Sequence, residues 1–352
     1  MRISIVLTDP TLKQVGGYKM VYIYANALVK RGHDVHIYYR RYSQRSPYAM
    51  NVVDSIFRSF ISAIEPRWFD LDSRIRKSKV EKLTQKMFLK SDVIILTAVV
   101  TASEFYNLNI NEKKVIYFIQ DYENWGIKDE KLRETYRYGY KNIVVAKWLK
   151  NIVDKYSIIP SLYIKNGIDL EKFNLLSEKS IENRKRYTIA MLYHNQKRKN
   201  SAMGLEVLKR LKNDYPEMKA YLFGTVARDD KIPAWVEYTE KASTAQLMEI
   251  YNKSAVFMCT SNIEGFGLTG LESMACGCAL VSTKCKGVME YAVDGYNSLL
   301  SDVEDIEAMV NNIKKLFDNP LERIQISKNA YKDAQKFDVY QMVDMFCKEV
   351  EG

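Results

Sequence analysis

The sequence predicts an α/β fold with two parallel, doubly wound sheets, on three observations. Short apolar runs alternate with longer segments of helical spacing along the chain, a pattern typical of parallel strands covered by helices. The chain has 352 residues, more than one core normally holds, so two domains of about 150 to 200 residues are expected. The composition, 47% hydrophobic and 27% charged, is that of a globular protein.

The first domain is expected to span residues 1–170. Its strands are predicted from short apolar runs bounded by polar or turn residues. The predicted strands are Ile3–Leu7, Val35–Tyr39, Val93–Leu96, Val115–Ile119, Asn142–Val145 and Leu162–Ile164. The segment NGID at 166–169 closes this series and is interpreted as a tight turn.

The stretch 171–186 is polar and has no clear periodicity, so it is interpreted as a linker. The second domain is expected at 187–320. Its predicted strands are Tyr187–Leu192, Ala220–Phe223, Val236–Tyr238, Ala255–Cys259, Ala279–Ser282 and Ser298–Leu300. Residues 321–352 are helical in pattern and end without a strand partner, which leaves open a return of these helices to the first domain.

The formal net charge is +10, and the surplus is concentrated between Arg40 and Lys90, where twelve basic residues stand against five acids. The same segment carries the aromatic residues Phe57, Phe60, Trp68, Phe69 and Phe88. Cations mixed with exposed aromatics suit peripheral contact with an anionic membrane. A solvated helix face over a buried apolar stripe is the alternative. No nucleic-acid recognition module is visible, so specific nucleic-acid binding is not expected.

Three further features of the sequence favour a cytoplasmic protein. Its expected peripheral location is the inner face of the cell membrane. The opening MRISIVLTDP is too brief for a signal peptide and is interpreted as a buried strand. The longest apolar stretch, residues 93–102, is about half the length that a spanning helix needs. The odd number of cysteines, 5, favours reduced thiols. They form no zinc-like pairs, and no metal site is expected.

The most informative stretch is CTSNIEGFGLTGLESMACGCA at 259–279, where an apolar strand, a glycine loop and a helix follow one another. Glu264 and Glu272 bracket the loop. Gly265 and Gly267 allow backbone N–H groups to approach a ligand closely, and the positive end of the helix dipole favours a phosphate or polar sugar there. The alternative is an ordinary strand-to-helix turn with solvated acids.

Three further loops follow predicted strands, at the sheet edge where ligands of α/β proteins bind. The first holds Gly16 and Gly17 just ahead of a predicted helix. The second holds the cations of 197–199 at a helix start, where an anion would offset their unfavourable position, and a solvated basic turn is the alternative. The third, IQDYENWG, offers Asp121 as an acceptor for a substrate hydroxyl, or as a helix cap.

The sequence resembles the retaining glycosyltransferases of family 4, which have the GT-B fold. The segment EGFGLTGLE at 264–272 matches the Glu-x7-Glu signature of that family, and SMACGCALVSTKCKGVMEYAVDGYNSLL follows it. The Gly16–Gly17 loop, NGID at 166–169 and KRKN at 197–200 stand in the expected order. The resemblance covers nearly the whole chain and implies two Rossmann-like domains that face a cleft.

The resemblance also implies roles for individual residues. Glu264 would contact sugar hydroxyls, Glu272 would hold the ribose of the nucleotide, and Arg198 and Lys199 would neutralise the diphosphate. The residues implied in catalysis are Glu264, Lys199, Arg198 and Asp121. Those implied in donor binding are Gly16, Gly17, His194, Lys197, Phe266, Gly267, Leu268, Thr269 and Glu272. The nucleotide-sugar would be a substrate, with no cofactor and no metal, and the acceptor would be a glycan or a lipid-linked glycan.

The sequence departs from the family pattern at three places. Lys199-Asn200 stands where many relatives have Lys-Gly, and Tyr193 stands where many have Arg. Gln120-Asp121 replaces a His that many relatives carry, and QDYE resembles a branch that includes bacterial rhamnosyltransferases. A catalytically silent nucleotide-sugar-binding partner of another glycosyltransferase is the alternative function.

Overall fold

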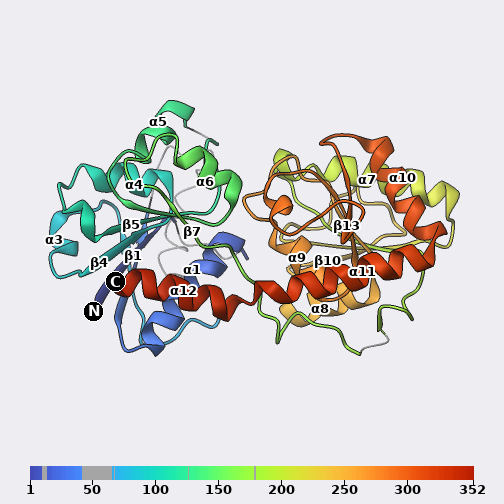
Figure 1. Cartoon of the computed structure of the whole chain (residues 1–352), viewed down its shortest axis with the longest axis horizontal. Helices are drawn as coiled ribbons and strands as arrows, with labels where there is room; N and C mark the ends of the chain where they lie inside the picture. Colours follow the sequence, from blue (N-terminus) through green and yellow to red (C-terminus); the bar gives the residue numbers. More distant parts are fainter. Residues whose placement is uncertain (10–13, 42–65, 67, 126, 178–179) are drawn as a thin grey trace. The chain divides into compact units, whose positions relative to one another are not determined.

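The computed structural model describes residues 1–9, 14–41, 66, 68–125, 127–177 and 180–352. The chain divides into two compact units (Figure 1). The first unit consists of Met1–Lys165 together with Met342–Gly352, and the second consists of Asn166–Gln341. The sheet of each unit is entirely parallel in its described pairs, as the alternation of strands and helices predicts.

The first unit contains a 7-stranded sheet in the order β3-β2-β1-β4-β5-β6-β7. Its strands are β1 (Arg2–Leu7), β2 (Asp34–Arg40), β3 (Arg76–Val80), β4 (Val93–Leu96), β5 (Val115–Ile119), β6 (Lys141–Val144) and β7 (Leu162–Tyr163). Its helices are α1 (Gly16–Lys30), α3 (Gln85–Phe88), α4 (Val99–Tyr106), α5 (Asp129–Thr135) and α6 (Lys147–Val153). Strand β3, RKSKV, was not predicted because an edge strand that faces solvent lacks the apolar pattern.

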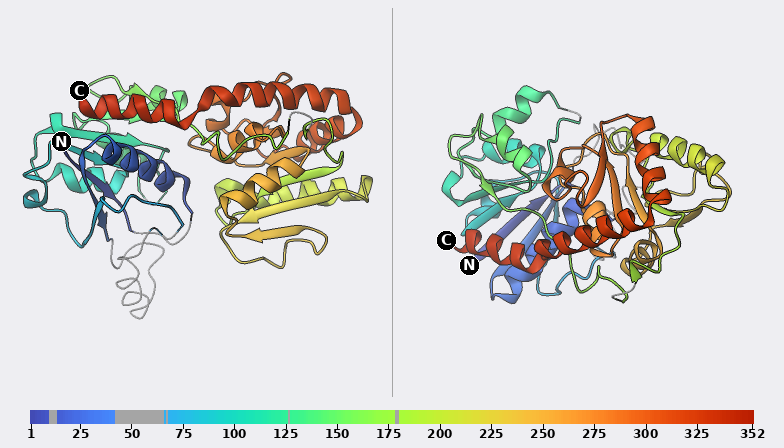
Figure 2. Two further views of the ribbon diagram at one scale, coloured as in Figure 1. Left: turned by 90° about the horizontal axis from the view of Figure 1, so that it is seen from below. Right: turned by 45° about the vertical axis from the view of Figure 1, so that its right-hand side comes forward.

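The second unit contains a 6-stranded sheet in the order β10-β9-β8-β11-β12-β13. Its strands are β8 (Thr188–Leu192), β9 (Lys219–Gly224), β10 (Glu237–Glu240), β11 (Val256–Cys259), β12 (Ala279–Thr283) and β13 (Ser298–Ser301). Its helices are α7 (Ser201–Asp214), α8 (Thr244–Lys253), α9 (Leu268–Ala275), α10 (Ile306–Asp318) and α11 (Pro320–Ala334), and α12 (Val339–Glu351) contains the unit boundary. Figure 2 shows α11 and α12 as successive helices at the end of the chain.

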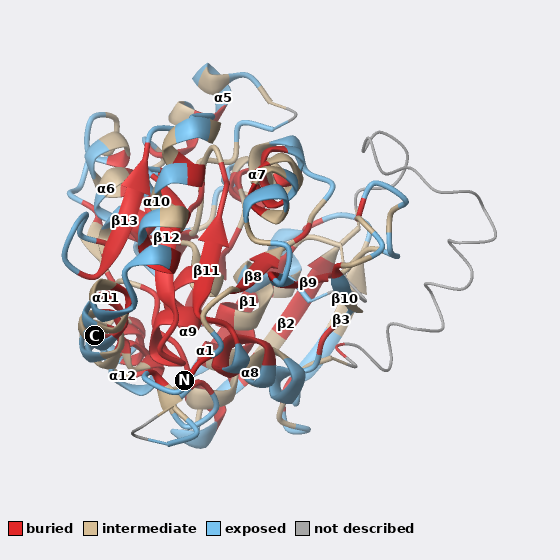
Figure 3. Cartoon of the chain, turned by 90° about the vertical axis from the view of Figure 1, so that its right-hand side faces the viewer, coloured by how far each residue is buried: buried red, intermediate tan, exposed pale blue. Residues whose placement is uncertain are grey.

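Burial explains why these segments form strands. All residues of β11 and β12 are buried (Figure 3), because helices pack on both faces of a parallel sheet. On one face, Met191, Met258 and Val281 join a core with residues of α7 and α10. On the other face, Phe257 packs against Tyr251 of α8.

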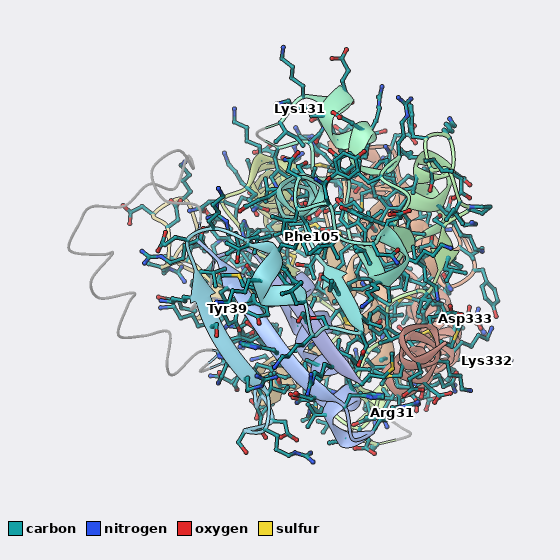
Figure 4. All side chains as sticks on the ribbon, turned by 90° about the vertical axis from the view of Figure 1, so that its left-hand side faces the viewer. Arg31, Tyr39, Phe105, Lys131, Lys332 and Asp333 are labelled. Carbon is teal, nitrogen blue, oxygen red and sulfur yellow. The ribbon has the colours of Figure 1, made fainter. Side chains whose placement is uncertain are left out.

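The C-terminal residues complete the first unit. Phe346 of α12 stacks on Tyr24 of α1, with ring centroids 4.1 Å apart. Arg31, at the end of α1 (Figure 4), pairs with Asp344 and with Glu351 at 3.0 Å. Residues 342–352 therefore belong to the first unit, while the rest of the segment 321–352 belongs to the second.

The expected linker, 171–186, lies inside the second unit, and the change of unit falls at Lys165–Asn166. Phe173, Ile181 and Arg184 are all buried. Arg184 donates to the carbonyl oxygens of Tyr251 at 3.2 Å and Ser254 at 2.5 Å, and also to that of Cys276. The polar composition of the stretch concealed these buried side chains, which fix it to the carboxyl ends of α8 and α9.

Of the aromatics proposed for membrane contact, the three that the structure describes are buried or half-buried. Phe88 is buried and packs against Tyr38 and Phe105. Trp68 and Phe69 are half-buried against Tyr22 of α1. Phe57 and Phe60 lie outside the described residues. In the described part of the chain, no helix combines the length and the apolar character needed to cross a membrane.

Replacing Arg184 with Met should lower the free energy of unfolding by roughly 2–4 kcal/mol, because several helix-terminal carbonyls would lose their donor in a buried place. Urea unfolding followed by circular dichroism measures the loss. Arg210→Met is the matched control, since the Arg210 side chain is 41% exposed, and it should change stability by about 0.5 kcal/mol or less. Equal effects of the two substitutions would contradict this role of Arg184.

Candidate active site in the second unit

The predicted glycine loop connects β11 to α9. Gly267 is the N-cap of α9, with φ at +85°, a conformation that glycine adopts at little cost. Tyr291 fixes the turn, because its hydroxyl donates to the carbonyl oxygen of Gly267 at 2.6 Å. A Cβ at Gly270 would lie 2.4 Å from the same hydroxyl oxygen. Both glycines are therefore required by the packing of Tyr291 against the start of α9.

The first turn of α9 offers backbone donors. Among the hydrogen bonds of the described residues, none uses the N–H of Phe266, Gly267, Leu268 or Thr269. These groups lie at the positive end of the helix dipole, where an anion is stabilised. The side chain of Phe266 is buried against Tyr291 and Phe337, so only its backbone is suited to the predicted donor-binding role.

A buried ion pair lies beside this turn. Lys199 Nζ is 2.7 Å from both carboxylate oxygens of Glu264, and the hydroxyl of Ser261 donates to Glu264 Oε1 at 2.6 Å. The Glu264 side chain is 7% exposed and that of Lys199 is 15% exposed. The structure thus brings together two residues that stand 65 positions apart in the sequence.

Burial alone would raise the pKa of Glu264. The positive charge and hydrogen bonds of Lys199 outweigh this effect, helped by Ser261 and by the charge of Arg198, so the pKa lies below its ordinary value. Glu264 is therefore ionised at neutral pH despite its burial.

Neutral hydrogen bonds join the two loops that carry this pair. Asn262 N donates to the carbonyl oxygen of Arg198 at 2.7 Å, and Asn200 Nδ2 donates to Asn262 Oδ1 at 3.0 Å. The hydroxyl of Thr260 donates to the carbonyl oxygen of Asn200 at 3.0 Å. These hydrogen bonds therefore hold the loop after β8 and the loop after β11 in a fixed position relative to each other.

The basic loop differs from the prediction in its local structure. Residues Lys197–Lys199 form a short 3-10 turn, and α7 begins only after Asn200, its N-cap, which has φ at +46°. The Nδ1 atom of His194 accepts the N–H of Gln196 at 3.0 Å, so this ring shapes the turn. Arg198 Nε donates to Gln196 Oε1 at 3.1 Å, and Lys197 is exposed.

A small pocket of about 10 Å³, room for about one water molecule, lies between these loops. Its lining includes the predicted residues Lys199, Glu264 and Thr269, together with Leu192, Phe257, Met258, Cys259, Thr260 and Ser261. Sequence reasoning missed Ser261, although its place three residues before Glu264 on the same loop is a usable signal. In the described residues, no group of His, Cys, Asp or Glu is arranged to hold a metal ion.

Glu272 lies one turn further along α9 and is buried. The hydroxyl of Tyr251 donates to its Oε2 atom at 3.3 Å. The pKa of Tyr251 lies well above its ordinary value, first because of burial and then because of the charge of Glu272. Glu272 does not line the described pocket, so the predicted ribose contact remains a prediction.

The remaining predicted residues, Gly16, Gly17 and Asp121, lie in the first unit. Gly16 and Gly17 are the first residues of α1 rather than a loop ahead of it, since the N-cap is Val15. Gln120 Nε2 donates to the carbonyl oxygen of Gly17 at 3.1 Å. Asp121 Oδ1 accepts the N–H of Tyr122 at 2.9 Å. The side chain of Gln120, the residue before Asp121, therefore joins the loop after β5 to the first turn of α1.

Comparison with known proteins identifies the region that carries the pocket. Residues 172–333 match the model of the family described as glycosyl transferases group 1. The fold of the chain is GT-B, with two Rossmann-like parallel sheets, as the resemblance implied.

Solved structures of similar fold cover nearly the whole chain. Sucrose-phosphate synthase from Thermosynechococcus elongatus matches with a TM-score of 0.77 and 15% identity, over 99% of this chain and 98% of that chain. Anabaena HepE in complex with UDP and glucose matches with a TM-score of 0.74 and 15% identity, over 100% and 99%.

The curated relatives match over shorter stretches. An N,N'-diacetylbacillosaminyl-diphospho-undecaprenol alpha-1,3-N-acetylgalactosaminyltransferase of Campylobacter jejuni is 29% identical over 30% of this chain and 28% of its own length. A D-inositol 3-phosphate glycosyltransferase of Corynebacterium urealyticum is 25% identical over 49% and 46%. In these matches the chain spans about a quarter to a half of the relatives. The rhamnosyltransferase branch stays a prediction.

Replacing Lys199 with Met should destabilise the protein by about 2–4 kcal/mol at pH 7, because a buried carboxylate would lose its partner. A carboxylate with a lowered pKa in the folded state contributes stability above its unfolded pKa, and this contribution is lost as the pH falls. Without Lys199, Glu264 can instead bind a proton, so the deficit should shrink toward pH 4.

Thermal unfolding across this pH range checks the expectation. Lys209→Met on the exposed face of α7 is the control for the loss of one positive charge. A deficit of Lys199→Met that stays constant from pH 4 to pH 8 would show that the pair is not the source of the effect.

Proposed function

We propose that this chain is a retaining, metal-independent glycosyltransferase. It transfers a hexosyl or deoxyhexosyl group from a nucleotide-sugar donor to a glycan or lipid-linked acceptor, in the synthesis of cell-surface polysaccharide. The observation that carries the proposal is the buried Lys199–Glu264 pair, which lines a pocket beside the unpaired N–H groups of α9, within the matched family region.

Departure of a nucleoside diphosphate is the main difficulty of this reaction, because negative charge develops on the leaving phosphate. An ammonium group has three donors, and the two short contacts of Lys199 to Glu264 leave one for a phosphate oxygen. Arg198 and the N–H groups of the first turn of α9 would add positive potential at the same place. Fixed donors of this kind stabilise developing charge without reorganising.

Glu264 is better suited to position the sugar than to act as a base. Both of its oxygens are already engaged, and its lowered pKa makes it a weak proton acceptor. A carboxylate fixed in this way would accept hydrogen bonds from sugar hydroxyls through the lone pairs that Lys199 and Ser261 leave unused. The leaving phosphate is then the group that assists the incoming hydroxyl on the same face of the sugar.

Names of similar proteins support the classes of donor and acceptor. HepE of Anabaena has been solved with UDP-glucose, and TarM of S. aureus with UDP. The Campylobacter jejuni relatives are named for diphospho-undecaprenol acceptors. A UDP-sugar donor and an anionic lipid-linked acceptor are therefore the first substrates to test.

A panel of UDP-, GDP- and TDP-sugars, scored by thermal shift and by donor hydrolysis, should identify a donor that stabilises the protein. With that donor, Lys199→Ala should lower kcat by about 100- to 1,000-fold. The exposed Lys209→Ala should leave kcat unchanged. Unchanged transfer by Lys199→Ala would contradict the proposed role, and donor binding without transfer or hydrolysis would favour a catalytically silent partner protein.

The two acids should differ in their effects on binding. Glu272→Ala should weaken binding of free nucleotide and full donor alike, whereas Glu264→Ala should weaken only the full donor. Isothermal titration with UDP and with the donor found by the panel measures both. If Glu264→Ala lost the same affinity for UDP as for the full donor, Glu264 would not be the residue that contacts the sugar.

We also propose a peripheral location at the inner face of the cell membrane, supported by the net charge of +10 and by the lipid-linked acceptors named for relatives. The protein should float with anionic vesicles at low ionic strength and be released as salt screens the attraction. Vesicles of neutral lipid are the control. Absence from the anionic vesicle fraction at low salt would exclude this location.

A further inference from the structure

The loop after β5, residues 120–124, is tied to three helices of the first unit. At its start, the side chain of Gln120 holds the carbonyl oxygen of Gly17, in the first turn of α1. A Cβ at Gly17 would lie 3.3 Å from Gln120 Nε2, so the two groups are in close contact. This bond fixes the beginning of the loop against the amino end of α1.

The middle and the end of the loop are fixed to α5. The hydroxyl of Tyr122 donates to Asp129 Oδ2 at 2.9 Å, and Asn124 Nδ2 donates to Asp129 Oδ1 at 3.2 Å. Arg133, one turn further along α5, contacts both Tyr122 and Asp129. Two side chains of the loop thus share a single carboxylate at the first turn of α5.

Glu123 forms the third attachment. Its Oε2 atom accepts the N–H of Val99, the first residue of α4, at 2.8 Å. A carboxylate at this point bonds a free backbone donor and meets the positive end of the helix dipole. Glu123 is half-buried, which limits the solvation of its charge.

Asp121 lies between these attachments. Its Oδ1 atom accepts the N–H of Tyr122 at 2.9 Å, so its carboxylate is oriented by the loop that carries it. The side chains of Gln120, Tyr122, Glu123 and Asn124 each bind a neighbouring helix. The loop is therefore built as a support for Asp121 at the carboxyl edge of the sheet.

We propose that Glu123 is a positioning residue for the acceptor: its bond to the first turn of α4 sets the place at which Asp121 receives an acceptor hydroxyl. This inference rests on the proposed function. Glu123 itself does not touch the substrate in this role. Loss of its bond to Val99 would free one side of the loop and displace Asp121, and small displacements of a substrate-binding group have large effects on rate.

The charged and titratable groups around Glu123 make the attachment dependent on pH. Burial is the main cause that raises the pKa of Glu123, and the charge of Asp121 adds to it. The hydrogen bond from Val99 N lowers the pKa, and the net result is a pKa of about 7. Tyr117 and Tyr136 face it from β5 and the end of α5, and both carry strongly raised pKa values, so they stay neutral. The ionised carboxylate is the stronger acceptor, so the attachment tightens as Glu123 loses its proton.

The test compares Glu123→Ala and Glu123→Gln with wild type in steady-state transfer, varying acceptor and donor separately from pH 6 to pH 8. Glu123→Ala should raise the acceptor KM about 10- to 100-fold and leave the donor KM unchanged. Glu123→Gln keeps a neutral acceptor atom for Val99, so its acceptor KM should lie below that of Glu123→Ala and match that of wild type at low pH. In wild type the acceptor KM should fall as the pH rises through about 7, and in Glu123→Gln this dependence should disappear.

Glu130→Gln is the matched control. Glu130 is an exposed residue of α5, and its substitution removes the same charge close to the same loop. Thermal melting checks that each variant is folded. An unchanged acceptor KM in Glu123→Ala, or a donor KM that rises equally, would overturn the inference while leaving the proposed function intact. A wild-type protein that transfers sugar from no donor would overturn the proposed function, and this inference with it.

Discussion

The arrangement of the second unit depends on one buried ion pair. A carboxylate such as Glu264 cannot stay ionised out of water unless a cation and further donors face it. Lys199 and Ser261 meet that requirement, but Lys199 comes from the loop after β8 and Glu264 from the loop after β11. The two loops must therefore keep one fixed register, and the bonds that Asn200 and Asn262 make between them provide it.

Helix α9 is constrained at both ends in opposite ways. The N–H groups in its first turn are unpaired beside the pocket, whereas at its other end the carbonyl oxygen of Cys276 accepts a hydrogen bond from Arg184. Arg184 also binds carbonyl oxygens at the end of α8. A cation at the negative end of the helix dipole stabilises it, so the buried arginine fixes the helix from behind while its positive end stays available to an anion.

Much of this fold could be predicted from the sequence, because the buried strands are short apolar runs and the glycine loop has a distinct signature. Strand β3 was not predicted because its residues face solvent and lack an apolar pattern. Residues 171–186 were interpreted as a linker because few of them are apolar. At the site, Glu264 and Lys199 were predicted as separate candidates. Their direct contact could not be predicted, since it depends on β8 and β11 being neighbours in the sheet. The attachment of Glu123 to α4 likewise depends on the order of β4 and β5.

The discontinuous first unit has a consequence for synthesis of the chain. Its sheet is assembled from residues 1–165, but Phe346 and the partners of Arg31 come from residues 342–352. During translation, the surface of α1 that Phe346 covers stays open to solvent until the ribosome has finished the entire second unit. The second unit, which is continuous, can complete its core earlier. The first unit can therefore complete its packing only after residues 342–352 have been synthesised.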